Sequence, residues 1–575
     1  MSVTNEDNPV VDHAKDMGDK HDQQDKATSW YPMIRGVALC LAIASLIGFV
    51  VLGILIRQHN LVGDYGLANI VFLICPFLGV LLIVGWLSVF AFRGWQRLLP
   101  PVVLFLLMAS PFLFLKIREV DGEMVPIFAW RFAPDPDELL EVPPPVETTA
   151  DDPEVLSDLA TVTPEDFDRF LGTDGRQRVA SLFLEHDWDA HPPKLLWEQP
   201  IGAGWSAFAT RNGYAVTMEQ RSEMELVTCY EVETGKLIWS HGVPTRYETK
   251  LGGIGPRATP TIDEHGMVFA NGATGILRCI NGNTGQLVWK TNILEELSIP
   301  VSHDASSVMY GRSNSPLVYD DVVVVPGGRG PDGPSSPEYR SSLVAFDRDT
   351  GELKWQGGSD QIAYASPVLG ELDGVRQVIS VNESSVTGHD ADSGNVLWSF
   401  ECGRPGSSSA DSNNSQPVVV GEDLLFISKS YGIGSALKKI RRDDAGDWQV
   451  TEIWQDYSIL KTKFTNVVIH DGYAYGLSDG IMQCADLNTG EEMWKGGRFH
   501  QGQILGVGDV ILLVNEKKAE VTMIDMNPDG FYKLGKFQAL SSTEKVWNHL
   551  ALYGNKLLVR DAQTAACWEL PIRKD

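Results

Sequence analysis

One pattern recurs along the C-terminal part of the chain: an apolar strand, a polar turn that closes on glycine, and a short strand that ends in tryptophan. It is clearest in VTCYEVETGKLIW, which ends at Trp239, and in MQCADLNTGEEMW, which ends at Trp494. The turn offers a side chain that can cap its own backbone and a glycine that can adopt positive φ, so each copy predicts a hairpin. Short strands repeating about every 40 to 50 residues indicate a β-propeller with about four strands per blade.

The tryptophans predict the number of blades. The last copy, LLVRDAQTAACWELPI, stops before its outer strand, and KLLWEQPI at residues 194–201 has the tryptophan but no preceding repeat. We therefore expect this N-terminal strand to complete the last blade and close the ring, which removes open sheet edges. The prediction is an all-β, eight-bladed propeller over residues 194–571, whose outer strands carry Trp197, Trp239, Trp289, Trp355, Trp398, Trp454, Trp494 and Phe537.

Three apolar runs without a charged residue precede the repeat, at residues 36–56, 67–92 and 98–115. A helix of about 20 such residues crosses the roughly 30 Å of hydrocarbon in a bilayer. Buried core helices are the alternative, which three such runs so close together disfavour. About 35 polar residues precede the first run, unlike a cleaved signal peptide. We predict three transmembrane helices within residues 36–115, the first an uncleaved anchor.

Lysine and arginine near the ends of these runs predict the orientation. Five lie on the side of the N-terminus and four on the other, which places an acidic tail at residues 1–35 in the cytoplasm and the propeller outside it. The chain is thus expected to be a multi-pass protein of the plasma (inner) membrane. Residues 116–162, rich in proline and acids, predict an extended linker, and residues 163–193 a lead-in segment with a short helix after the N-cap Thr163.

The formal net charge of −28 excludes a protein that binds nucleic acid through phosphate contacts, since such a protein needs a basic face. Four cysteines, Cys229, Cys279, Cys484 and Cys567, occupy the same repeat position in different blades, so we expect small buried side chains rather than disulfides. No cysteine and histidine spacing is typical of zinc sites, and neither a metal site nor a catalytic residue is assigned.

The segments that lead into the innermost strands are expected to converge on the propeller axis. They would gather bases and aromatic rings into a funnel, formed by Trp205, Arg257, Arg312, Asn314, Tyr364, Asn414, Lys463 and Trp547. Such a funnel suits a small, anionic, planar ligand, because arginine binds carboxylates and tryptophan offers a stacking face. Alternatively, these side chains cap strand ends, bridge neighbouring blades or pair with nearby acids.

The copies ending in Thr-Gly-x-x-x-Trp resemble the pyrroloquinoline-quinone (PQQ)-type propeller repeat. This family includes quinoprotein alcohol dehydrogenases and the propeller lipoprotein of the bacterial outer-membrane β-barrel assembly machinery, and the resemblance covers roughly residues 164–571. The segment DRFLGTDGR, which leads into PPKLLWEQPIGAGWSAF, is also similar to membrane-anchored bacterial proteins. For the enzymes the resemblance implies PQQ with calcium, an adjacent cysteine pair and, in many, a CxxCH haem motif; this sequence has neither cysteine motif.

The resemblance therefore favours a membrane-tethered, extracytoplasmic propeller that acts as a non-catalytic scaffold for a protein partner. Two alternatives stay open. One is a PQQ-dependent alcohol or sugar dehydrogenase that binds its cofactor in the funnel, and the other is a sensor of carbohydrates or other small ligands.

Overall fold

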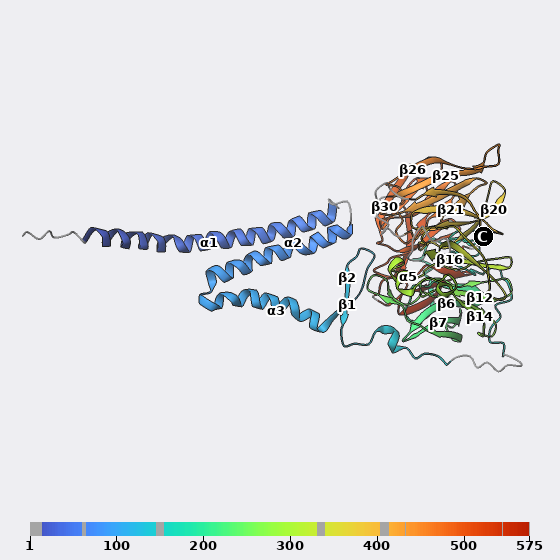
Figure 1. Ribbon diagram of the computed structural model, residues 1–575, viewed down its shortest axis with the longest axis horizontal. Helices are drawn as coiled ribbons and strands as arrows, with labels where there is room; N and C mark the ends of the chain where they lie inside the picture. Colours follow the sequence, from blue (N-terminus) through green and yellow to red (C-terminus); the bar gives the residue numbers. More distant parts are fainter. Residues whose placement is uncertain are drawn as a thin grey trace, which may run out of the picture. The chain divides into compact units, whose positions relative to one another are not determined.

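The computed structural model describes residues 14–59, 65–144, 154–329, 340–402, 413–431, 433–542 and 544–573. They form two compact units, and Figure 1 labels several of their helices and strands. Unit 1 comprises the chain up to Arg118 together with Glu123–Ala133. Unit 2 comprises Glu119–Gly122 together with the chain from Pro134 onward.

Unit 1 contains three long helices, α1 (Ala14–His59), α2 (Tyr65–Trp86) and α3 (Leu99–Phe114), with a π-helix η1 (Leu87–Ala91) and a 3₁₀ helix η2 (Gly94–Leu98) before α3. Helices α1 and α2 run side by side (Figure 1), and the Trp86 indole donates a 3.0 Å hydrogen bond to the Arg35 carbonyl. By length and composition three segments of the described residues could cross a membrane: Pro32–Ile56, Ile74–Ala91 and Gly94–Phe114. The expected apolar helices are therefore present.

Strands β1 (Leu115–Val120) and β2 (Pro126–Trp130) form a two-stranded sheet that the sequence did not predict. The last two residues of β1 and the first two of the connection to β2, together Glu119–Gly122, belong to unit 2.

The described part of unit 2 contains eight blades, each built on four antiparallel strands, together with the small sheet of β9 (Glu248–Thr249) and β10 (Gly253–Ile254). The first four are blade 1, β5 (Ala209–Arg211), β6 (Tyr214–Arg221), β7 (Met224–Glu231) and β8 (Leu237–Pro244); blade 2, β11 (Thr261–Ile262), β12 (Met267–Asn271), β13 (Ile276–Asn281) and β14 (Leu287–Asn292); blade 3, β15 (Leu317–Tyr319), β16 (Val322–Arg329), β17 (Arg340–Asp347) and β18 (Leu353–Gly357); and blade 4, β19 (Val368–Leu372), β20 (Val375–Val381), β21 (Ser385–Asp390) and β22 (Val396–Glu401).

The other four complete the ring. They are blade 5, β23 (Val418–Val420), β24 (Leu424–Lys429), β25 (Gly434–Arg442) and β26 (Trp448–Asp456); blade 6, β27 (Val468–His470), β28 (Tyr473–Ser478), β29 (Ile481–Asp486) and β30 (Glu492–Arg498); blade 7, β31 (Gln503–Val507), β32 (Val510–Val514), β33 (Glu520–Asp525) and β34 (Lys533–Gln538); and blade 8, β35 (Ala551–Tyr553), β36 (Lys556–Arg560), β37 (Thr564–Glu569) and β4 (Lys194–Pro200).

Blade 8 confirms the predicted ring closure. Strand β4 pairs antiparallel with β37, with Trp197 opposite Cys567, although the two lie at opposite ends of the propeller sequence. This pairing gives the last blade four strands like the others and covers the edge of β37, which would otherwise be open to pairing with another chain.

Several outer-strand tryptophans contact the next blade. The Trp197 indole donates a 2.7 Å hydrogen bond to the Val232 carbonyl of blade 1, and the Trp494 indole a 2.7 Å bond to the Asn527 carbonyl of blade 7. The third-strand cysteines lie opposite this position, with Cys229 facing Trp239 and Cys484 facing Trp494. Burial raises the pKa of the Cys484 thiol to about 12, so it stays a neutral, small, apolar side chain.

The described residues 134–144 and 154–162 of the expected linker contact the propeller at several points. Residues Pro136–Leu139 form a 3₁₀ helix, η3, whose Asp137 is buried and pairs with Arg246 of the propeller. Leu159 is fully buried in the core between blades 1 and 2. Apolar leucines spaced among the acids give this segment enough surface to bury, which a count of acids and prolines does not register. Residues 145–153 lie outside the described part.

The short helix predicted after Thr163 does not form in residues 163–193, all of which the structure describes. The Thr163 hydroxyl and amide both bond the Asp166 carboxylate, which closes a turn, and Phe167 then pairs with Thr210 of β5. The capping residues are those of a helix N-terminus, but the next residues find backbone partners on the propeller instead. Further along, β3 (Arg178–Val179) adds a parallel strand to β31 of blade 7.

Candidate functional site

The segments that enter the innermost strands meet at one end of the propeller channel, here called the mouth. Their asparagines join neighbouring blades. Asn548 of blade 8 donates a 2.8 Å hydrogen bond to the Ser206 carbonyl of blade 1, and Asn314 of blade 3 donates to the Ala365 carbonyl of blade 4 at 2.6 Å. Asn414 likewise donates to the Lys463 carbonyl at 2.8 Å. Asn314 and Asn414 therefore bridge blades, as the alternative interpretation of these polar residues predicts.

Arg312 is a structural residue rather than a ligand-binding one. It is 1% exposed, and its guanidinium pairs with Asp304 at 2.8 Å. Asp304 lies in α5 (Val301–Ser307), which follows α4 (Ile293–Glu296) in an insertion before blade 3. The guanidinium also donates to the Pro326 carbonyl at 3.0 Å. These contacts anchor the insertion to blade 3 and leave little of the arginine for a ligand.

Arg257 and Tyr364 line the mouth at blades 2 and 4. The Arg257 guanidinium lies over the Tyr247 ring, 5.6 Å from its centroid, and donates to the Gly252 carbonyl next to the small hairpin of β9 (Glu248–Thr249) and β10 (Gly253–Ile254). Burial lowers the pKa of Arg257. Tyr364 packs edge-on against Tyr310, with ring centroids 5.3 Å apart, and burial raises its pKa.

A lysine between two tryptophans forms the centre of the remaining cluster. The rings of Trp205 and Trp547 lie 5.0 Å apart, and the Lys545 ammonium is 3.7 Å from the Trp547 centroid and 5.0 Å from that of Trp205. The predicted Trp205, Lys463 and Trp547 thus lie in one region, but the base at its centre is Lys545, which sequence reasoning missed. Lys545 begins KVWNHL (residues 545–550), the segment that leads into β35. Only its two tryptophan neighbours in space distinguish it from other lysines.

Glu516 is the second functional residue that the sequence did not indicate. Its side chain is fully buried, and it follows β32, at the turn to β33, rather than preceding an innermost strand. The carboxylate accepts hydrogen bonds from the Trp547 indole at 2.8 Å and from the Gln501 amide at 3.0 Å. This acid lies beside Trp547, so the region that was expected to be cationic also holds a buried carboxylate.

The four residues Glu119–Gly122, which lie outside the repeat, are part of this mouth. Glu119 and Asp121 are 4% and 8% exposed. The Glu119 carboxylate is 2.9 Å from the Lys545 ammonium, and a β-carbon at Gly253 would come within 2.6 Å of it. The sequence placed residues 119–122 in a linker, so their presence among Lys545, Trp205 and Glu516 was not predicted.

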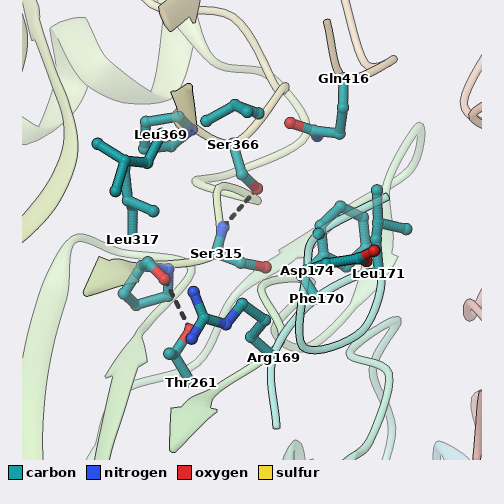
Figure 2. A pocket seen from close by; sticks show the side chains of 14 residues that line it. Arg169, Phe170, Leu171, Asp174, Thr261, Ser315, Leu317, Ser366, Leu369 and Gln416 are labelled. Atoms are coloured by element: carbon teal, nitrogen blue, oxygen red, sulfur yellow. Dashed lines mark hydrogen bonds between the residues drawn. The ribbon is translucent and has the colours of Figure 1, made fainter. Parts of the chain in front are cut away.

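The lead-in segment lies along the innermost strands of several blades. Phe167 pairs with Thr210 of blade 1, the Ile262 amide of blade 2 donates to the Asp168 carbonyl at 2.8 Å, and Arg178 pairs with Gly506 of blade 7. A pocket of about 80 Å³ lies beside this segment. Figure 2 shows Arg169 extending toward Thr261 along the wall formed by Ser315 and Ser366. This pocket belongs to the packing of the segment on blades 2 to 5.

These residues do not fit PQQ with calcium while Glu119–Gly122 occupy the mouth. The acids take up the lysine that a carboxylate of the quinone would need, and Arg312 pairs with Asp304. Across the residues that the structure describes, no group of three or more His, Cys, Asp or Glu side chains could bind a metal ion. What the site can do is bind a peptide segment through both ion pairs and backbone hydrogen bonds.

Comparison with known proteins gives one family. A family model described as outer membrane protein assembly factor BamB matches residues 187–313 and 223–496. The curated tetrathionate hydrolase of Acidithiobacillus ferrooxidans is 26% identical over 199 residues, which are 34% of this chain. The matched part spans only 36% of that relative's own length.

Among the solved structures that match, two illustrate the low sequence identity. BamB from Moraxella catarrhalis is 14% identical, with a TM-score of 0.47, covering 66% of this chain and 100% of that one. Quinohemoprotein alcohol dehydrogenase from Comamonas testosteroni is 11% identical, with a TM-score of 0.48, covering 73% and 82%. The propeller fold itself rests on the strand pairing described above.

Proposed function

Because the chain belongs to the family whose model is described as outer membrane protein assembly factor BamB, we propose that it is a membrane-tethered scaffold. In this proposal α1, α2 and α3 cross the inner membrane, and the propeller lies outside the cytoplasm and binds protein partners without catalysing a reaction. The observation that carries it is the filled mouth: a peptide segment lies where a dehydrogenase of this fold would need an open site for its cofactor and substrate.

The first test asks whether the protein binds PQQ and calcium. Purified full-length protein is mixed with PQQ and calcium, and its thermal unfolding and ultraviolet-visible spectrum are measured. We expect neither a shift in Tm nor a new absorbance band. A saturable shift in Tm, together with dye reduction in the presence of alcohols or sugars, would show a dehydrogenase and refute the scaffold.

Topology is tested with single cysteines and a membrane-impermeant maleimide. Val301 of the blade 3 insertion is 71% exposed, and Trp95, at the start of the third candidate span, is 73% exposed. In spheroplasts, Val301→Cys should be labelled and Trp95→Cys should be labelled only after lysis. The reverse pattern would place the propeller in the cytoplasm.

Partner binding is tested by a photo-crosslinking amino acid at exposed propeller positions in intact cells. Tyr532 before β34 and Val301 are suitable, because both side chains reach solvent. We expect adducts of discrete mass with envelope proteins at one of these positions. No adduct at any exposed loop of the propeller would contradict a scaffold role.

A further inference from the structure

The segment Glu119–Gly122 is bound by the propeller through its side chains. The Glu119 carboxylate is 2.9 Å from the Lys545 ammonium, and the Asp121 carboxylate is 2.9 Å from the Lys517 ammonium. The Lys545 and Glu119 side chains are only 2% and 5% exposed. A buried charge is stable only beside its counter-charge, so Lys545 favours an acid at position 119, while the partly exposed Lys517 adds a weaker attraction for an acid at position 121.

The segment is also bound through its backbone. The Gly122 amide donates a 2.7 Å hydrogen bond to Glu516, and the Gly122 carbonyl accepts a 3.0 Å bond from the Lys463 ammonium. Lys545 further donates to the Val120 carbonyl. These bonds fix the path of the turn without regard to the side chain of Val120, because they involve main-chain atoms.

The fourth position admits only glycine. A β-carbon at Gly122 would lie 2.6 Å from Cγ of Gln501 and 2.7 Å from Oε1 of Glu516. Contacts this short require Gln501 or the hydrogen-bonded Glu516 carboxylate to move. The mouth therefore distinguishes Glu-x-Asp-Gly from other acidic turns by charge at two positions and by size at the last.

We propose that the mouth is a recognition site for an acidic turn of the form Glu-x-Asp-Gly, and that Glu119–Gly122 is a tethered occupant that a loop of a protein partner must displace. This deepens the proposed scaffold function, on which it rests, by naming the chemistry of the partner. The tether is a two-stranded sheet, β1 and β2, and such isolated hairpins are marginally stable by themselves. The tip can therefore leave while the propeller stays folded.

The tethered copy has a high effective concentration, on the order of millimolar for a short connection, so it lowers the apparent affinity of a free peptide. Gly122→Val should expel the tip and leave the propeller sequence unchanged. The probe is a fluorescent peptide of residues 115–126, LKIREVDGEMVP, and its anisotropy is measured with full-length protein in detergent. We expect about tenfold tighter binding, or more, to Gly122→Val than to the unmodified protein.

Three controls test whether the peptide binds at the mouth and through its charges. A peptide with Gln and Asn in place of Glu119 and Asp121 should bind at least tenfold more weakly, because its charges are removed. Lys545→Met added to Gly122→Val should abolish binding of the original peptide. Glu154→Gln, an exposed acid before the propeller, should leave affinity as in the unmodified protein.

Equal affinity of Gly122→Val and the unmodified protein would overturn the proposal, and so would equal binding of the neutral peptide. If Gly122→Val lowers Tm strongly, Glu119→Gln replaces it as the variant that loosens the tip, with the same expectations. If the peptide does not bind but envelope proteins still crosslink to the propeller, this inference alone is refuted. Binding of PQQ and calcium by Gly122→Val in place of the peptide would refute both this inference and the scaffold function.

Discussion

The indole of Trp197 lies directly against the α-carbon of Gly235 in the neighbouring blade. A β-carbon at Gly235 would come within 2.7 Å of Cδ2 of Trp197. The same contact recurs around the ring, with Trp239 against Gly285, Trp289 against Gly351, Trp355 against Gly394 and Trp454 against Gly490. Five of the tryptophans therefore pack on the turn glycine of the next copy of the repeat, and this contact joins the blades concerned.

Gly235→Ala should destabilise the propeller through two effects. The backbone φ of +71° is unfavourable for alanine, and the new methyl group would overlap the Trp197 ring. We expect a loss of about 3 kcal/mol, measured by chemical unfolding. Gly446→Ala is the matched control, because Gly446 has φ +90° and no atom within 4 Å of the added carbon, so it should lose only about 1 kcal/mol. Equal losses of stability would show that the contact with Trp197 adds nothing to the cost of Gly235→Ala.

Arg312→Leu should lower stability because it leaves the buried Asp304 without its counter-charge. We expect a loss of about 3 to 5 kcal/mol in the free energy of unfolding, the range typical of broken buried ion pairs. Arg376→Gln breaks a pair with Asp320 that is largely exposed, and should cost less than about 1 kcal/mol. A small effect of Arg312→Leu would mean that this arginine is available to a ligand after all.

Leu159→Ala should be costly although the residue lies in an acidic, proline-rich stretch. The side chain is fully buried in the core between blades 1 and 2, so its removal leaves a cavity there. We expect a loss of about 2 to 5 kcal/mol, and for Val155→Ala, 69% exposed, less than about 0.5 kcal/mol. Thermal unfolding of both variants measures the difference, and indistinguishable Tm values would indicate that the segment does not pack on the propeller in solution.

Stability below neutral pH should depend on His549. Its ring packs edge-on against Phe170, with centroids 4.7 Å apart, and burial lowers its pKa to about 3 from 6.5. Between these values the unfolded chain binds the proton and the folded chain does not, so stability falls as pH decreases from 6.5 toward 3. In His549→Phe, Tm should fall less between about pH 7 and about pH 4 than in the unmodified protein.

Asp561 supplies the opposite control. Burial raises its pKa to about 6 from 3.8, so in this window the folded chain binds the proton and acidification stabilises it. Asp561→Asn keeps an oxygen that can accept from the Thr564 amide and removes this contribution. The Tm of Asp561→Asn should therefore fall more steeply on acidification than that of the unmodified protein. If the Tm of both variants changed with pH in parallel with that of the unmodified protein, neither pKa shift would contribute to stability in this range.

The order of the amino acids was enough to predict the propeller, its blade number, its closure and the presence of three apolar helices. The reason is that the contact that joins blades is encoded locally and then repeated: each copy carries both its tryptophan and its turn glycine. Even the closure by residues 194–200 could be inferred, since the missing outer strand and the unmatched Trp197 are defects in that repeat. Trp205, Lys463 and Trp547 of the mouth were expected for a related reason, because each precedes an innermost strand.

What fills the mouth became visible only in the folded chain. Val120 and Lys545 are 425 positions apart, and the hairpin tip lies outside the repeat, so no periodicity relates the tip to the residues it contacts. Arg312 likewise meets Asp304 through an insertion found in one blade. A repeat predicts the contacts that every copy makes, because each copy must bury the same face. Contacts made once, between a repeat and a segment outside it, depend on where the folded chain brings that segment, and charge and size at the mouth then determine which residues fit.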